Sequence, residues 1–87
     1  MAPIRKKVTI QNKQGLHARP AALFVQVANK FDSQITVAKG KEKVNGKSIM
    51  GILMLAANKG SQIIIEASGE DAEEAILQLE ALVSKDE

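Results

Sequence analysis

The amino-acid sequence predicts an α+β fold, a two-layer open-faced sandwich in which three helices cover one face of a four-stranded antiparallel sheet. Every predicted strand alternates apolar and polar residues, as a sheet with one solvated face requires. Three other segments repeat apolar residues every three or four positions, which is typical of amphipathic helices. Their order, βαββαβα, is satisfied most simply by one antiparallel sheet covered on a single side. The chain has 87 residues, 45% of them hydrophobic, so a single domain is expected over residues 1–87.

The first strand is predicted over residues 5–10 and the first helix over residues 18–31. Val8 and Ile10 should point inward, because they alternate with polar residues. Pro20 is compatible with a helix here because it falls in the first turn. The apolar positions that define the inner side of this helix are Ala21, Phe24, Val27, Ala28 and Phe31.

A hairpin is predicted next. Ile35 and Val37 alternate with polar residues and indicate its first strand. Lys39-Gly40 offers a turn, and a shorter strand follows around residues 42–44.

A short second helix is predicted over the apolar run 49–57. The hydroxyl of Ser48 can cap its first amides, and Asn58 and Gly60 terminate it. Its inner side is assigned by spacing to Ile52, Leu55 and Ala56. Four further apolar residues cannot all face the core of so short a helix, namely Ile49, Met50, Leu53 and Met54.

The last strand is predicted over residues 62–67 and is followed by a third helix. Asp71 and Glu74 form a plausible capping pair at the start of that helix. Its apolar stripe consists of Ala72, Ala75, Ile76, Leu79, Leu82 and Val83.

The charge is distributed unevenly along the chain. Residues 1–60 contain 11 basic and 2 acidic residues, a net charge of +9, whereas residues 61–87 contain 1 and 8, a net charge of −7. The basic portion favours an acidic partner. Nucleic acid is a poor candidate for that partner, because the chain has no Trp or Tyr and both Phe residues lie at core spacing.

Several classes of protein are excluded by composition. The chain has no Cys and one His, which leaves no thiol nucleophile and too few ligands for a typical transition-metal site. The longest apolar stretch, residues 49–57, is too short to span a membrane, and the N-terminus lacks a signal-peptide pattern. A cytoplasmic protein without metal, cofactor or membrane contact is expected.

The lone His17 lies where a loop meets a helix. The first amides of a helix have no partners within it, so an anion on His17 would meet the N–H groups of Ala18 and Arg19. The guanidinium of Arg19 adds donors suited to phosphate oxygens. The same positive field disfavours the imidazolium and should leave His17 neutral and nucleophilic. Alternatively, His17 merely caps the helix and Arg19 is a solvated surface charge.

Two segments carry a resemblance to a known family. GLHARPAA at residues 15–22 and VNGKSIMGILML at residues 44–55 resemble the HPr family, the phosphocarrier proteins of the bacterial phosphoenolpyruvate-dependent phosphotransferase system. The resemblance covers essentially the whole chain. The fold it implies is the same open-faced sandwich that the periodicity predicts.

This resemblance implies a function. In that family, His17 would accept a phosphoryl group on Nδ1 from phosphorylated enzyme I and pass it to a IIA domain, with Arg19 assisting. The protein would be a monomeric carrier and not an enzyme. Whether the relay ends in sugar uptake or in the nitrogen-related regulatory branch stays open.

The resemblance also implies a role for Ser48 and its surroundings. The matching Ser in the family is phosphorylated by a regulatory HPr serine kinase/phosphorylase, although a Ser at this place could be only a helix cap. A docking patch beside His17 is implied for the exposed apolar residues of the second helix, with a basic rim. Its expected members are Ile49, Met50, Leu53 and Lys47, with Met54 and Lys13 as further candidates. Local burial against the first helix is the alternative.

Two other functions remain as hypotheses. The chain could be a binding module that regulates partners without carrying phosphate, as HPr-like paralogues do when the active His is absent, but the presence of His17 argues against this as its sole role. Nucleic-acid binding through residues 1–60 would require a steep salt dependence of affinity.

Overall fold

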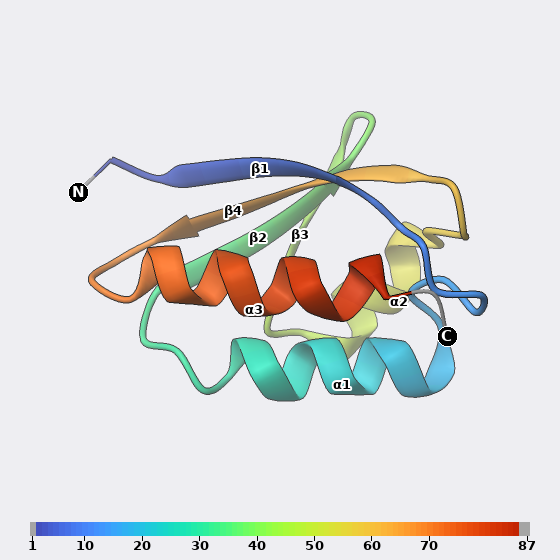
Figure 1. Cartoon of the computed structure of the whole chain (residues 1–87), viewed down its shortest axis with the longest axis horizontal. Coiled ribbons are helices and arrows are strands. Elements are labelled where there is room, and N and C mark those ends of the chain that lie inside the picture. The colour runs from blue at the N-terminus through green and yellow to red at the C-terminus, as the bar shows by residue number, and fades with distance from the viewer. Residues whose placement is uncertain (1, 86–87) are drawn as a thin grey trace.

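The computed structural model describes residues 2–85 and confirms the predicted sandwich (Figure 1). The elements of these residues are β1 (Ile4–Thr9), α1 (Ala18–Ala28), β2 (Gln34–Lys39), β3 (Glu42–Asn45), α2 (Ile49–Leu55), β4 (Gln62–Ser68) and α3 (Ala72–Ser84). The strand order is β1-β4-β2-β3, and every neighbouring pair is antiparallel. The helices cover one face: α3 contacts β1 and β4, α2 contacts β2 and β3, and α1 packs on α2 and α3. No helix of residues 2–85 is long and apolar enough to cross a membrane.

The core lies between the sheet and the helices. Val8 of β1 pairs with Ile63 of β4, and Val37 of β2 pairs with Ile65 of β4. All four side chains are buried, and so is Phe24 of α1. Burial of an aliphatic or aromatic side chain of this size contributes about 1.5–3 kcal/mol relative to exposure. The helices therefore pack on the inward-facing apolar side chains that the alternation of each strand predicted.

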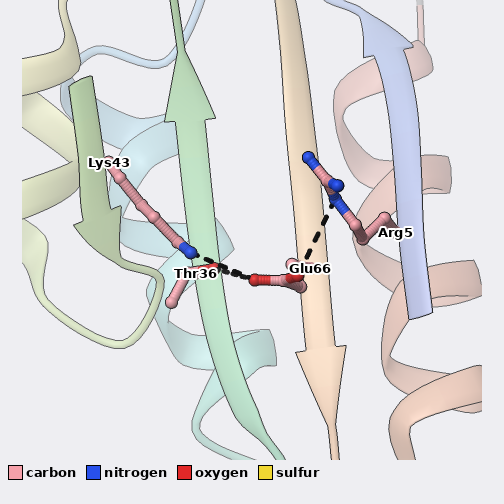
Figure 2. A network of polar contacts seen from close by, with 4 residues as sticks. All are labelled: Arg5, Thr36, Lys43 and Glu66. Atoms are coloured by element: carbon pink, nitrogen blue, oxygen red, sulfur yellow. Dashed lines mark hydrogen bonds and ion pairs between the residues drawn. The ribbon is translucent and has the colours of Figure 1, made fainter. Parts of the chain in front are cut away.

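The open face of the sheet carries a polar network that joins all four strands (Figure 2). Glu66 of β4 accepts a hydrogen bond from the hydroxyl of Thr36 on β2 at 3.4 Å. The same carboxylate lies 3.2 Å from the ammonium of Lys43 on β3 and 3.7 Å from the guanidinium of Arg5 on β1. Both cations are largely exposed, so each ion pair contributes at most about 1 kcal/mol.

The hairpin turn lies one residue later than predicted. Lys39 pairs with Glu42, so the two-residue loop is Gly40-Lys41 and not Lys39-Gly40. Gly40 adopts φ +60°, a left-handed conformation that glycine reaches without steric cost.

The first helix ends at Ala28 and not at Phe31. The N–H of Asn29 donates to the carbonyl of Val25, but the N–H groups of Lys30 and Phe31 donate only three residues back. Beyond Ala28 the hydrogen bonds therefore have the three-residue spacing of a 3₁₀ turn, and the α-helix ends. Phe31 is nevertheless buried, as its spacing predicted.

The second helix is also shorter than predicted, and one inward assignment is wrong. Ile52 and Leu55 are buried as expected, but Ala56 is exposed and Ala57 takes its place in the core. Ala56 adopts φ +52°, which ends the helix. The ammonium of Lys39 donates to the carbonyls of Leu55 and Ala56, so these carbonyls at the end of the helix have a hydrogen-bond donor.

The predicted capping pair at the start of α3 is wrong. Asp71 is the N-cap residue, but its carboxylate makes no cap hydrogen bond. It accepts instead from the N–H groups of Asp32 and Ser33, at 2.9 and 3.0 Å, and from the hydroxyl of Ser33. Glu74 accepts from the side-chain amide of Gln78. The loop before β2 therefore competes successfully for the carboxylate that would otherwise cap α3.

Candidate functional site

The candidate site is the loop that joins β1 to α1. Within this loop, the N–H of Gly15 donates to the carbonyl of Asn12 at 3.1 Å, and the side-chain amide of Asn12 donates to the carbonyl of Gly15 at 2.9 Å. Leu16 is fully buried and serves as the apolar anchor of the loop. These contacts place His17 directly after a fixed segment of backbone.

A second loop, residues 56–61, packs directly against this one. The N–H of Leu16 donates to the carbonyl of Ala57 at 2.8 Å. Gly15 adopts φ +67°, and a Cβ placed there would lie 2.5 Å from the carbonyl oxygen of Ala57 and 2.9 Å from the Cα of Asn58. Only glycine fits this conformation and this close approach. Gly15 therefore holds the His17 loop against the loop that follows α2.

His17 is the N-cap residue of α1, but its side chain does not cap the helix. Its backbone is extended, with φ −121° and ψ 157°, and its imidazole is half-buried. Nε2 lies 2.8 Å from Oδ1 of Asn58. Because an amide oxygen only accepts hydrogen bonds, a hydrogen bond to this oxygen requires the proton on Nε2, which in a neutral ring leaves the lone pair on Nδ1. The interpretation of His17 as a mere helix cap is not supported by this geometry.

Backbone strain is present next to His17. Ala18 adopts φ +48°, which is uncommon for a residue with a Cβ and costs about 1–2 kcal/mol. Such conformations occur where a site requires a particular backbone path. Ala18 and Arg19 both lie in the first turn of α1, where amides lack intrahelical acceptors, and both are exposed.

Arg19 lies on the surface beside this turn. Within residues 2–85 no carboxylate forms an ion pair with its guanidinium. Arg19 also lines an open groove of about 480 Å³ between the His17 loop and the end of α3. The other lining residues are Asn12, Gln14, Leu16, Pro20, Leu23, Leu82, Val83 and Lys85. Arg19 is thus available to an anion that approaches from solvent.

Ser48 is the N-cap residue of α2, as predicted. Its Oγ accepts a hydrogen bond from the N–H of Gly51 at 3.0 Å. A Cβ at Gly51 would lie 3.1 Å from the Cβ of Val44, so this helix approaches β3 closely. Ser48 as a whole is half-buried, so capping α2 does not remove this residue from the surface.

The apolar side chains of α2 form a surface patch, defined here as Ile49, Met50, Leu53 and Met54. Met50 and Met54 are 66% and 68% exposed, and Ile49 and Leu53 are 40% and 38% exposed. The prediction that these residues cannot all be buried is confirmed. The α2 patch belongs to the helix whose end leads, through Ala56 and Ala57, to the Asn58 that contacts His17. In Figure 1, α2 and the start of α1 lie at the same end of the molecule.

Lys47, an expected member of the basic rim, is held by a backbone carbonyl. Its ammonium donates to the carbonyl of Phe31 at 2.6 Å, and the residue is half-buried. This contact ties the start of α2 to the loop after α1. Lys13, by contrast, is exposed in the His17 loop.

Asn58 is the functional candidate that the sequence analysis missed. It was predicted only to terminate the second helix, and it lies 41 positions from His17 in the sequence. No local pattern marks such a partner. Only the topology, which brings the loop after α2 beside the loop before α1, reveals it.

The fold and this site together define a class of small open-faced sandwich proteins that present a histidine at a helix N-terminus. The family model described as the PTS HPr component phosphorylation site matches residues 4–85, and the chain belongs to this HPr family.

Related sequences and structures agree with that assignment. HPr-like protein Crh of Bacillus subtilis (strain 168) is 47% identical over 83 residues, which cover 95% of this chain and 98% of that protein. Phosphocarrier protein HPr of Neisseria meningitidis serogroup A is 46% identical over 81 residues, 93% of this chain and 91% of that protein. The crystal structure of phosphocarrier protein HPr from Bacillus anthracis superposes with a TM-score of 0.93 at 52% identity, covering 95% of this chain and 99% of the other.

Proposed function

We propose that this chain is a phosphocarrier that accepts a phosphoryl group on His17 from phosphorylated enzyme I and transfers it to IIA domains. The observation that supports this most directly is which nitrogen of the His17 imidazole is hydrogen-bonded and which is not. Nε2 is engaged by Asn58, which leaves Nδ1 as the basic nitrogen at the start of α1. A neutral imidazole nitrogen is the nucleophile that such a transfer requires.

The transfer uses groups of this chain only for nucleophilic attack and charge stabilisation. The Nδ1 lone pair forms the new N–P bond while the bond between phosphorus and the donor atom of phosphorylated enzyme I breaks, and its electron pair returns to that atom. The guanidinium of Arg19 and the first-turn amides of Ala18 and Arg19 stabilise the phosphoryl oxygens. No metal or cofactor is assigned a role in this protein.

Docking of partners is assigned to the α2 patch and to the basic charge of residues 1–60. The exposed methionines suit this role, because Met side chains adapt to partners of different shape. Part of the basic charge of residues 1–60 is neutralised, because Arg5 and Lys43 pair with Glu66. The exposed Lys13 and Arg19 near His17 are the charges that favour partners with acidic surfaces and accelerate their association at low salt. Enzyme I and the IIA domains are the partners that the family implies.

A second, regulatory function is supported by the similarity to Crh. A solution structure described as the Bacillus subtilis catabolite repression HPr is 46% identical to this chain, with a TM-score of 0.74, and covers 97% of it. Phosphorylation of Ser48 by an HPr serine kinase/phosphorylase would place a phosphate at the N-terminus of α2, next to the α2 patch. The positive end of the helix dipole tolerates that charge, so modification would alter binding and not the fold.

The carrier function is tested by phosphorylation with purified enzyme I and phosphoenolpyruvate. Stoichiometric labelling that is stable in base and lost in acid is expected for a phosphohistidine. Labelling that survives acid, or no labelling at all while a known HPr is labelled in parallel, would contradict the proposal and favour the regulatory function.

The chain is proposed to act as a monomer. Other oligomeric states exist among its relatives, because a crystal structure of Crh is described as a domain-swapped dimer. Light scattering coupled to gel filtration decides the question, and a concentration-independent mass near 9.3 kDa is expected.

A further inference from the structure

We infer that Asn58 is a positioning residue for this phosphoryl transfer, because its side-chain oxygen fixes the tautomer of His17. This inference rests on the proposed function. Asn58, in the loop after α2, would thus influence the reaction of His17, at the end of the loop before α1.

The backbone of Asn58 is held in place by hydrogen bonds on both sides. The N–H of Asn58 donates to the hydroxyl of Ser61 at 3.2 Å, and the carbonyl of Asn58 accepts from the N–H of Ser61 at 2.9 Å. The preceding residue, Ala57, is buried and accepts from the N–H of Leu16. The amide oxygen therefore meets the imidazole without having to order a loop first, and this preorganisation lowers the entropic cost of the contact.

The contact selects one of two imidazole tautomers. In a neutral histidine either ring nitrogen can carry the proton, and the group that faces one nitrogen decides which form is populated. With Oδ1 of Asn58 at 2.8 Å from Nε2, the form with the proton on Nε2 gains a hydrogen bond. The other form would place two lone pairs against each other, and the amide would have to turn over and present its NH2 group to Nε2. Nδ1 is thereby kept as the nucleophilic nitrogen.

The same hydrogen bond becomes stronger during the transfer. When Nδ1 forms its bond to phosphorus, Nε2 keeps its proton and the ring becomes a phosphorylated imidazolium, so no proton has to move. A positively charged donor makes a stronger hydrogen bond than a neutral one. An interaction that is stronger after the bond forms than before stabilises the transition state more than the ground state.

The retained proton also matters for the second transfer. When a IIA domain attacks the phosphorus, the N–P bond breaks and its electron pair returns to Nδ1. Because Nε2 has kept its proton, the leaving group is neutral imidazole and not an imidazolate anion. Asn58 therefore supports both the loading and the unloading of His17.

The direct test is nuclear magnetic resonance of the imidazole nitrogens, with long-range proton–nitrogen correlations recorded where His17 is neutral. The unmodified protein should show the proton on Nε2. Asn58→Ala should populate both tautomers, whereas Asn58→Asp, which keeps an acceptor at this place, should retain the Nε2 form. A proton on Nδ1 in the unmodified protein, or an unchanged tautomer in Asn58→Ala, would overturn the inference. The first of these observations needs no variant.

Transfer from enzyme I gives the functional readout. Loss of one hydrogen bond worth about 0.5–1.5 kcal/mol predicts that Asn58→Ala accepts phosphate about two- to tenfold more slowly. Asn29→Ala is the matched control, because Asn29 is an exposed amide bonded to the carbonyl of Val25 at the other end of α1. If Asn58→Ala transfers at the unmodified rate, Asn58 has no positioning role. If the unmodified protein is not phosphorylated at all, the proposed carrier function fails, while the tautomer measurement still reports on the contact.

Discussion

Asp71 and Ser33 lie 38 positions apart in the sequence, yet the hydroxyl and the backbone N–H of Ser33 both donate to the carboxylate of Asp71. The N–H of Asp32 donates to the same group. Gly69 makes this approach possible, because a Cβ there would lie 2.5 Å from the Ser33 hydroxyl. The start of β2 is thereby fastened to the start of α3.

The first prediction concerns acid stability. The hydroxyl of Ser33 first, and then the N–H of Asp32, hold the pKa of Asp71 below its ordinary value of 3.8. A carboxyl with a lowered pKa stabilises the fold at pH values above its ordinary pKa, and this contribution is lost as the pH falls through the lower, folded value. Asp71→Asn should therefore be less stable than the unmodified protein at pH 6 and lose less stability between pH 5 and pH 2. Denaturant unfolding across this range is the measurement, and equal slopes for the two proteins would contradict the assignment.

The second prediction concerns Gly15. Gly15→Ala introduces both a strained backbone and an overlap with the carbonyl of Ala57, whereas Gly40→Ala has a similar φ of +60° with no atom within 4 Å of the added Cβ. Gly40→Ala should cost about 1–2 kcal/mol from backbone strain alone. Gly15→Ala should cost about 1–3 kcal/mol more, because the two loops must separate. Urea unfolding of both variants measures the difference, and equal losses would mean that the loops are not held by this close approach.

The third prediction separates the charge of Arg19 from its shape. Arg19→Lys keeps the positive charge and loses the planar fork of donors. It should still accept phosphate from enzyme I, but about ten- to a hundredfold more slowly, because one charged hydrogen bond is worth about 1.5–3 kcal/mol. Stopped-time transfer assays at saturating enzyme I give the rate. An unchanged rate would remove Arg19 from the site.

The fourth prediction concerns Ser48. Ser48→Asp keeps a good N-cap and adds a negative charge that the helix dipole stabilises by about 0.3–1 kcal/mol, so circular dichroism and unfolding should show an intact fold. Transfer from enzyme I should nevertheless slow, most strongly at low ionic strength, because the new charge repels an acidic partner.

Ser48→Ala is the control for this experiment. It loses the hydrogen bond to Gly51 and about 1 kcal/mol of stability but adds no charge, so its transfer rate should stay normal. Identical rates for Ser48→Asp and the unmodified protein at low salt would leave Ser48 as a helix cap only.

The fold could be predicted from the sequence because its signals are local. Alternation in residues such as Val8 and Val37, and helical spacing around Phe24, specify which side of each element is buried. The order of the elements then leaves few ways to cover a single sheet face. These features repeat within a few residues and need no knowledge of the tertiary structure.

The errors arose where distant segments compete for the same group. The carboxylate of Asp71 had local amides to cap, but those of Asp32 and Ser33 take it. Such choices depend on how the loops meet in three dimensions.

The residues of the candidate site also fall into those that local sequence patterns indicate and one that they do not. His17, Arg19 and Ser48 could be proposed from their places at predicted helix starts and from the motifs around them. Asn58 could not, because its pairing with His17 joins two loops that only the folded topology brings together.

We propose above all that Nδ1 of His17 carries the phosphoryl group. The most direct measurement is phosphorus-31 nuclear magnetic resonance of the protein after incubation with enzyme I and phosphoenolpyruvate, recorded beside His17→Ala. One Nδ1-phosphohistidine signal is expected in the unmodified protein and none in His17→Ala, which should remain folded because His17 adds little to the core. A phosphorylated His17→Ala protein, or a phosphoryl group on Nε2 in the unmodified protein, would contradict it.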